Sequence, residues 1–219
     1  VAIRENQHEV DMNLEIAYAL GLDRKLVDRV PHLNLDEGLR RFGKKRIESL
    51  KNGEVFKRVV CMHVGSSSSQ WWKRWSVEKY AKVCEHLIRD HDLVILLGSR
   101  EERELSLAMA RQMSVMPHIL AGETSFLEDG AIVAESDLLI CNDSGLMHLA
   151  AAVGTPVVAI FGPTDYTKFA PLGDRHRIVR KDFECSPCYK MDGDWMVRNC
   201  PYEYRCLNSI GVEDVLRHL

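Results

Sequence analysis

Short runs of apolar residues alternate with helix-like segments between Val59 and Phe161. The apolar runs lie at residues 59–64, 93–97, 118–120, 137–141 and 156–161. Strands this apolar are buried on both faces, as they are in parallel sheets that helices cover from each side. The alternation therefore predicts an α/β, Rossmann-like fold whose ligands bind beyond the carboxyl ends of the strands.

The segments between these runs have the spacing of amphipathic helices. Helices are predicted at residues 76–88, 101–113 and 126–135 and from Gly145 onwards. Residues 1–57 differ, because their two predicted helices, Asn13–Leu20 and Asp36–Leu50, enclose no apolar run long enough for a core strand. We therefore expect residues 1–57 to form a helical connector that precedes an α/β domain at residues 58–219.

Composition and charge narrow the range of partners. With 219 residues, 46% of them hydrophobic, the chain can bury a sizeable core, and a net charge of -3 gives no overall field for nucleic acid. Helix 36–50 is locally basic, but its acidic residues favour a solvated face over a patch for acidic lipids or phosphorylated substrates. No stretch has the roughly 20 apolar residues that cross a bilayer, and no signal peptide is recognised. We expect a cytoplasmic protein and, because the chain begins at Val1 rather than Met, a missing N-terminal part.

A polar corner joins the apolar run 137–141 to the alanine-rich helix that follows it. Its residues are Asp143, Ser144, Gly145 and Leu146. The first amides of a helix lack partners within the helix and lie at the positive end of its dipole, so such a corner suits an anion such as a diphosphate. Asp143 has an alternative role as the cap of the helix. His148, one turn further on, could reach a ligand oxygen, although a lone helical histidine is more often packed or solvated.

Polar residues also follow the first two strands. Ser66 and Ser67, after the first strand, could approach a phosphate. Lys73 or Arg74 in the same loop could neutralise it, although ordinary surface cations on a flexible loop are an equally good interpretation. After the second strand, the carboxylate of Glu102 could accept hydrogen bonds from a ribose diol, although acidic residues are also common in the first turn of helices without ligands.

Several familiar catalytic motifs are absent from the sequence. There is no G-x-S-x-G turn, and the acidic Asp143 precedes Ser144, so we exclude a hydrolase in which Ser144 attacks with help from His148. There is no G-x-x-x-x-G-K-[ST] loop and no G-x-G-x-x-G fingerprint, which disfavours an ATPase and a nicotinamide-dependent enzyme.

The tail holds four of the seven cysteines in the pattern C-x2-C-x11-C-x5-C. These four are Cys185, Cys188, Cys200 and Cys206. The spacing permits a tetrahedral thiolate zinc site, but the second pair is wider than the two to four intervening residues typical of such sites. The favoured interpretation is no metal, with a disulfide or packing alone holding the loop.

The corner and the loops around it resemble glycosyltransferase family 9, the lipopolysaccharide heptosyltransferases. The resemblance is carried by residues 142–152 with Gly154-Thr155-Pro156 and Phe161–Thr164, by Gly65-Ser66 with Lys73–Ser76, and by Gly98 with Glu102. The cysteine-rich tail 185–206 is similar to that of heptosyltransferase II-like members. This resemblance implies that residues 58–219 are the C-terminal, donor-binding half of a GT-B enzyme built from two Rossmann-like domains.

The resemblance also implies a donor, ADP-L-glycero-D-manno-heptose, whose heptose passes to the lipopolysaccharide inner core with inversion and without a metal ion or other cofactor. It assigns the diphosphate to Ser66, Ser67 and Lys73, and the ribose to Glu102. It assigns the phosphates and the heptose to the corner, on Asp143, Ser144, Gly145, Leu146 and His148. Two departures from the family pattern, the insertion Ser68–Trp72 and Ser76 in place of a proline, affect the two serine assignments most.

In this family the carboxylate that deprotonates the acceptor lies in the N-terminal domain. We therefore expect no catalytic residue in this chain and no sugar transfer by the chain alone. The acceptor is expected at the membrane surface, with the protein peripheral to the inner membrane. Two alternatives stay open, a sugar-nucleotide epimerase of the same fold and a nucleotide-sugar binding module without catalysis.

Overall fold

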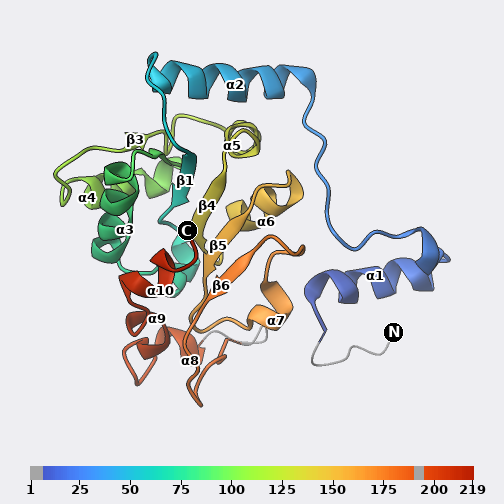
Figure 1. Cartoon of the computed structure of the whole chain (residues 1–219). Coiled ribbons are helices and arrows are strands. Elements are labelled where there is room, and N and C mark those ends of the chain that lie inside the picture. The colour runs from blue at the N-terminus through green and yellow to red at the C-terminus, as the bar shows by residue number, and fades with distance from the viewer. Residues whose placement is uncertain (1–6, 190–194) are drawn as a thin grey trace.

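The computed structural model describes residues 7–189 and 195–219 and shows a six-stranded sheet in which all neighbouring strands are parallel (Figure 1). The strands are β1 (Val59–His63), β2 (Leu93–Leu96), β3 (His118–Ile119), β4 (Leu138–Asn142), β5 (Val157–Ile160) and β6 (Arg177–Val179). Their order across the sheet is β3-β2-β1-β4-β5-β6. The Rossmann-like α/β fold predicted from the alternating apolar runs is confirmed.

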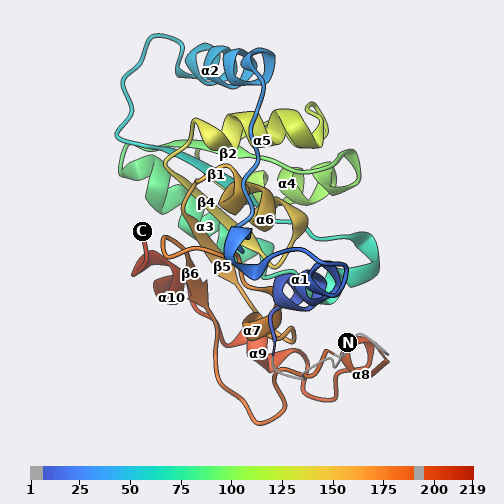
Figure 2. The same cartoon turned by 90° about the vertical axis from the view of Figure 1, so that its right-hand side faces the viewer.

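Helices cover both faces of this sheet, as its buried strands require (Figures 1 and 2). One layer holds α3 (Val77–Arg89), α4 (Arg103–Ala110), α9 (Arg205–Asn208) and α10 (Val212–Leu216). The opposite layer holds α2 (Glu37–Lys51), α5 (Phe126–Ala134) and α6 (Gly145–Ala152). The chain changes layer between β3 and β4, so strand order reverses between β1 and β4. Sheets of this kind bind ligands at that switch point.

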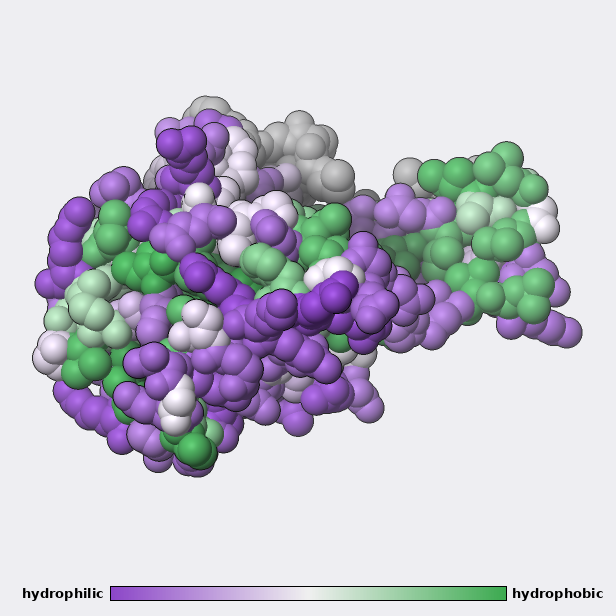
Figure 3. Space-filling view, turned by 90° about the horizontal axis from the view of Figure 1, so that it is seen from above, coloured by the Kyte–Doolittle hydropathy of each residue, from purple (hydrophilic) through white to green (hydrophobic). Residues whose placement is uncertain are grey.

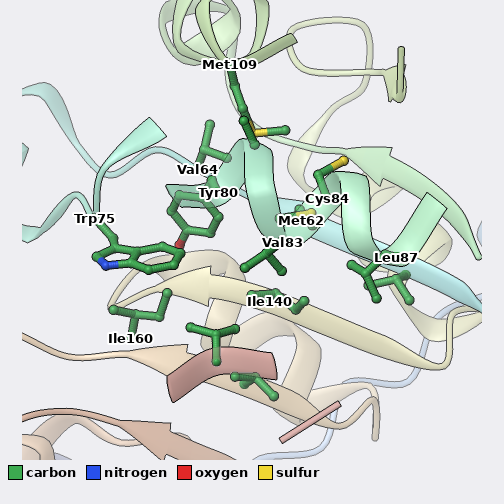
Figure 4. Packing of buried hydrophobic residues seen from close by; sticks show 14 of the residues in the cluster. Met62, Val64, Trp75, Tyr80, Val83, Cys84, Leu87, Met109, Ile140 and Ile160 are labelled. Carbon is green, nitrogen blue, oxygen red and sulfur yellow. The ribbon is translucent and has the colours of Figure 1, made fainter. Parts of the chain in front are cut away.

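The core under α3 ties this helix to the middle of the sheet. Tyr80 and Leu87 project from one face of α3 towards Met62 of β1 and Ile140 of β4 (Figure 4). The ring of Trp75, in the loop before α3, meets the ring of Tyr80 edge-on, with centroids 4.9 Å apart. These large side chains hold the start of α3 against the carboxyl ends of β1 and β4.

The segment before β1 is helical and contributes no strand within the described residues. It forms α1 (Glu9–Ala19), the 3-10 helix η1 (Arg24–Leu26) and α2. α2 crosses α5 so closely that a Cβ atom on Gly43 would lie 2.2 Å from the carbonyl oxygen of Ala131, which only glycine avoids. α1 begins at Glu9, ahead of the predicted start at Asn13, because the His8 ring accepts a hydrogen bond from the Val10 amide.

Exposed apolar side chains gather on this N-terminal segment. Ile16, Leu20 and Leu26 are each more than half exposed. Figure 3 shows apolar surface on the projecting right-hand part of the molecule, where α1 lies in Figure 1. Within the described part of the chain, no helix combines the length and the apolar character needed to span a bilayer.

Several elements of the described structure differ from the sequence prediction or were not predicted. The insertion after β1 forms the 3-10 helix η2 (Ser68–Lys73), and the predicted helix 101–113 begins as the 3-10 turn η3 (Arg100–Glu102). β6 has three residues and lies at the edge of the sheet, so its sequence is too short to show a strand pattern. The tail adds the short helix α8 (Trp195–Arg198), and α7 (Tyr166–Phe169) follows β5.

Candidate functional site

A cavity of about 780 Å³ opens beyond the carboxyl ends of β1, β2 and β4. Its lining includes the nine residues that the sequence analysis assigned to donor binding, which come from three separate segments of the chain. These are Ser66, Ser67, Lys73, Glu102, Asp143, Ser144, Gly145, Leu146 and His148. The structure therefore brings the predicted residues together at the switch point of the fold, and their individual roles stay predictions.

The side-chain amide of Asn142, the last residue of β4, connects segments that flank this cavity. Its nitrogen donates to the carbonyl oxygens of Val64 and Gly65, each at 3.0 Å. Its oxygen accepts from the Trp75 amide at 2.9 Å and from the Tyr80 hydroxyl at 3.0 Å. Asn142 is fully buried and all four of its hydrogen-bonding positions are used, so it joins β4 to the β1 loop and to α3.

The first turn of α6 lacks a cap from its own side chains. Ser144 is the N-cap residue, and neither it nor another side chain caps the helix in the described structure. Asp143 does not act as the cap, because its carboxylate is turned to Lys73 instead. The amides of Gly145 and Leu146 thus begin a helix whose positive end adjoins the cavity.

Lys73 and Asp143 form an ion pair at the edge of this helix end. Lys73 Nζ lies 2.8 Å from Asp143 Oδ2, and the two side chains are 12% and 6% exposed. The contact is electrostatic, because Oδ2 has no partner with hydrogen-bond geometry. Nζ also lies 5.6 Å from the ring centroid of Trp72 and 5.7 Å from that of Tyr189. Low exposure and two aromatic faces keep the ammonium inside the cavity.

The other residues of the β1 loop mainly hold the loop together. The Ser66 hydroxyl donates to the carbonyl oxygen of Gln70 at 2.9 Å and accepts from Arg74 Nε at 3.2 Å. Arg74 Nη2 also donates to the Ser66 carbonyl oxygen at 2.6 Å. Ser67 is exposed, and its hydroxyl meets that of Ser69 at 2.9 Å. Of the two candidate cations, Arg74 is thus bonded to its own loop, whereas Lys73 is paired with Asp143 at the helix end.

A histidine that the sequence analysis did not single out connects two of the predicted residues. His63 Nδ1 lies 3.1 Å from Ser144 Oγ, and Nε2 lies 3.1 Å from Glu102 Oε1. Gly65 permits this approach, because a Cβ atom there would lie 2.2 Å from Glu102 Oε1. The order serine, imidazole, carboxylate also occurs in hydrolases, but the turn at Ser144 lacks their G-x-S-x-G sequence. His63 ends β1, and its place at the carboxyl end of a strand was the signal that could have revealed it.

Glu102 is ionised in this arrangement. Burial opposes its charge, but the hydrogen bond and charge of His63, together with the Ser99 amide, outweigh burial and lower the pKa of Glu102 to about 2. The Ser99 amide donates to Oε2 at 2.9 Å. Both oxygens of the carboxylate are thus positioned by the protein, and their remaining lone pairs can accept hydrogen bonds from a ligand.

Two further titratable groups line the cavity. Burial raises the pKa of Asp129 to about 7, against the hydrogen bond from Thr124 and the charge of His63, which lower it. The pKa of His148 is lowered, mainly because neighbouring atoms keep water away from its ring. The positive charges of Lys73 and His8 lower it further, while the negative charge of Asp143 opposes the shift. His148 is therefore a neutral hydrogen-bonding group, and Asp129 titrates close to neutral pH.

The four tail cysteines are free thiols that lie in one neighbourhood. Burial raises the pKa of Cys188 and raises that of Cys206 to about 11, and the other tail thiols add to both shifts. In the described ranges, no three His, Cys, Asp or Glu side chains are placed to hold a metal ion. The absence of a metal at Cys185, Cys188, Cys200 and Cys206 stays a prediction.

Comparison of the amino-acid sequence with known proteins identifies a family to which the chain is similar. The sequence profile described as "Glycosyltransferase family 9 (heptosyltransferase)" matches residues 1–194. A curated relative, "Lipooligosaccharide heptosyltransferase 2" of Campylobacter jejuni subsp. jejuni serotype O:2, is 30% identical over 172 residues, which are 76% of this chain and 50% of that protein. The chain thus spans about half the length of this relative.

Solved structures show the same fold. A glycosyl transferase of family 9 from Veillonella parvula superposes with a TM-score of 0.80 at 22% identity, over 100% of this chain and 60% of that one. E. coli ADP-heptose lps heptosyltransferase II superposes with a TM-score of 0.76 at 24% identity, over 100% of this chain and 62% of that one. At these identities the likeness establishes the fold alone.

The Asn142 network predicts a large stability loss on truncation. Asn142→Ala leaves buried carbonyl and amide groups without partners, so we expect the free energy of unfolding to fall by at least ~2 kcal/mol in urea titrations. The matched control is Asn208→Ala, which removes an exposed side chain with a hydrogen bond to Glu203 and should change that energy by about 0.5 kcal/mol or less. Equal effects of the two substitutions would contradict the role given to Asn142.

The raised pKa of Asp129 predicts that replacing its carboxyl group with an amide, in Asp129→Asn, stabilises the fold in a pH-dependent way. Folded Asp129 keeps a proton up to about pH 7, whereas an ordinary carboxyl releases it near 3.8, so the wild type loses stability as pH rises between these values. Asp129→Asn should therefore match the wild type near the lower pH and become more stable than it by up to about 4 kcal/mol near pH 8. Urea unfolding of both proteins across this range measures the difference, and a constant difference would contradict the assignment.

Proposed function

The chain belongs to glycosyltransferase family 9, and from this premise we propose that it is the donor-binding half of a lipopolysaccharide heptosyltransferase. The donor is ADP-L-glycero-D-manno-heptose, and the complete enzyme transfers heptose to the lipopolysaccharide inner core with inversion at the anomeric carbon. The observation that carries the proposal is the uncapped first turn of α6 beside the sheltered ammonium of Lys73. Such a pairing of helix end and fixed cation suits a diphosphate.

In this proposal, different residues of the cavity bind different parts of the donor. The α6 amides, Ser144 and Lys73 take the diphosphate, while Glu102 accepts hydrogen bonds from the ribose hydroxyls through its ionised carboxylate. His148, neutral and at the cavity edge, hydrogen bonds to phosphate or heptose oxygens. Ser66 contributes by shaping the loop, because its hydroxyl is bonded to Gln70.

In the proposed reaction an acceptor hydroxyl attacks the anomeric carbon and ADP leaves with its added negative charge. Helix amides and Lys73 stabilise that charge without needing to reorganise, which is the main way such sites accelerate bond cleavage. Fixed protein charge takes the place that a metal ion occupies in other transferases. Deprotonation of the acceptor needs a general base, which we assign to an N-terminal half outside this chain.

The proposed division of the molecule follows from its length and its elements. The chain spans about half of the curated relative, and residues 7–57 hold helices that join no strand of the sheet within the described part. We assign them to a connector between two domains, with residues 58–219 as the donor domain. The acceptor would then be met at the cytoplasmic surface of the inner membrane. A sugar-nucleotide epimerase and a binding module without catalysis are the alternatives to be tested.

Nucleotide binding tests the site. We expect the chain to bind ADP in calorimetric titrations, and Lys73→Met to weaken binding by at least ~tenfold, because it removes a charged hydrogen-bond donor from a sheltered anion site. Lys82→Met, at an exposed position of α3 away from the cavity, is the matched control and should leave the affinity within about twofold. Equal losses in both variants, or a preference for UDP over ADP, would argue against this donor site.

Activity tests the division into halves. The purified chain should transfer no heptose from its ADP donor to a lipopolysaccharide core acceptor, because the general base lies outside it. A mass-spectrometric assay of the acceptor follows the reaction, and the full-length E. coli heptosyltransferase II serves as the positive control. Turnover by this chain alone would refute the proposal that it is a half-enzyme.

A further inference from the structure

His63 lies between two polar partners that impose opposite demands on its ring. Its side chain is 6% exposed, and each ring nitrogen has one partner, Ser144 Oγ or Glu102 Oε1. Gly98 closes the ring's other side, since a Cβ atom there would lie 3.2 Å from His63 Cδ2. The imidazole is thus confined between two partners of different chemistry.

The ionised partner decides which nitrogen carries hydrogen when the ring is neutral. Glu102 is a carboxylate with a pKa of about 2, and a carboxylate only accepts hydrogen bonds. Nε2 of His63 must therefore hold the proton, and Nδ1 is left as an acceptor. The Ser144 hydroxyl then donates to Nδ1 and presents only lone pairs to the cavity.

That orientation of the hydroxyl is wrong for an anion at the first turn of α6. Phosphate oxygens only accept hydrogen bonds, as the lone pairs of Ser144 do. The two acceptors would therefore face each other without a hydrogen bond. Protonation of Nδ1 reverses the direction of this hydrogen bond, because the imidazolium then donates to Ser144 Oγ. The Ser144 hydroxyl keeps its hydrogen and is free to donate it to a phosphate oxygen. One proton enters from solvent and no covalent bond is broken.

We propose that His63 is a positioning residue that turns the Ser144 hydroxyl into a donor, so that a diphosphate binds at α6 together with one proton taken up by His63. This inference rests on the proposed donor site and adds a regulation of that site by pH. Because binding then takes up one proton, the affinity for the nucleotide-sugar falls with rising pH, by up to about tenfold per pH unit.

Titratable groups face His63 from several neighbouring elements. Glu102 from η3 supplies a full negative charge, and Asp129 from α5, with its pKa raised to about 7 by burial, supplies a second charge above neutral pH. Cys141, its neighbour across the β1–β4 pair, stays a neutral thiol because burial raises its pKa. The remaining partner, Ser144, is uncharged.

Calorimetry of ADP-glucose binding tests the coupling. This probe carries a diphosphate esterified at both ends, so the ligand itself does not titrate between about pH 5.5 and 8.5. Titrations in HEPES and in Tris, whose ionisation enthalpies differ, give the number of protons taken up. We expect uptake that approaches one proton above neutral pH, and an affinity that falls with rising pH.

Two variants separate His63 from the other titrating group. Ser144→Ala removes the hydroxyl that must turn, so ADP-glucose should bind more weakly, with little proton uptake and a flatter pH profile. Asp129→Asn keeps the side-chain shape but cannot titrate, so proton uptake that remains in this variant cannot come from Asp129, and we expect most of the wild-type uptake to remain. ¹⁵N NMR of the ring should show a neutral Nε2–H tautomer without the nucleotide-sugar and an imidazolium with it.

The outcomes are distinguishable. Binding of ADP-glucose without proton uptake, or loss of uptake in Asp129→Asn alone, overturns the His63 coupling and leaves the donor site standing. An unchanged imidazole signal on binding overturns it too. Failure of the wild type to bind ADP and ADP-glucose at every pH overturns the donor site and this coupling with it.

Discussion

The side-chain amide of Asn142 is the interaction on which the cavity depends. It uses every donor and acceptor it has to join the end of β4 to the β1 loop and to α3. Because the group is fully buried, water cannot replace a lost partner, and each bond requires the others to be in place. Asn142 thereby fixes both ends of the loop that carries Lys73 relative to the corner that carries Ser144.

Titratable side chains in the cavity are paired with each other around a helix end that is not capped. Lys73 faces Asp143, and His63 faces Glu102, while His148 is kept neutral. Each pairing stabilises side chains that are largely buried, and it limits their movement. An anion that bound at this helix end would therefore meet side chains that the protein has already positioned.

Prediction from sequence succeeded where a pattern was local or periodic. The apolar runs gave the strands, and the glycine-containing corner after 137–141 gave the helix end that lines the cavity. It failed for His63, which looked like part of an apolar strand, and for Asp129, whose raised pKa comes from burial by residues distant in sequence. Asp143 suited a cap by its position, but the structure turns it to Lys73, a residue 70 positions earlier.

The amino-acid sequence alone determined the parallel α/β architecture, because burial on both faces makes β1, β2, β4 and β5 almost wholly apolar and because helix starts and turns depend on neighbouring residues. The tertiary structure alone decided which polar groups pair. Pairing depends on distances between atoms from separate segments, and those distances exist only after the sheet is assembled. The protonation of Glu102 and Asp129 follows from the same packing, since burial and nearby charge set a pKa and neither is visible in a linear sequence.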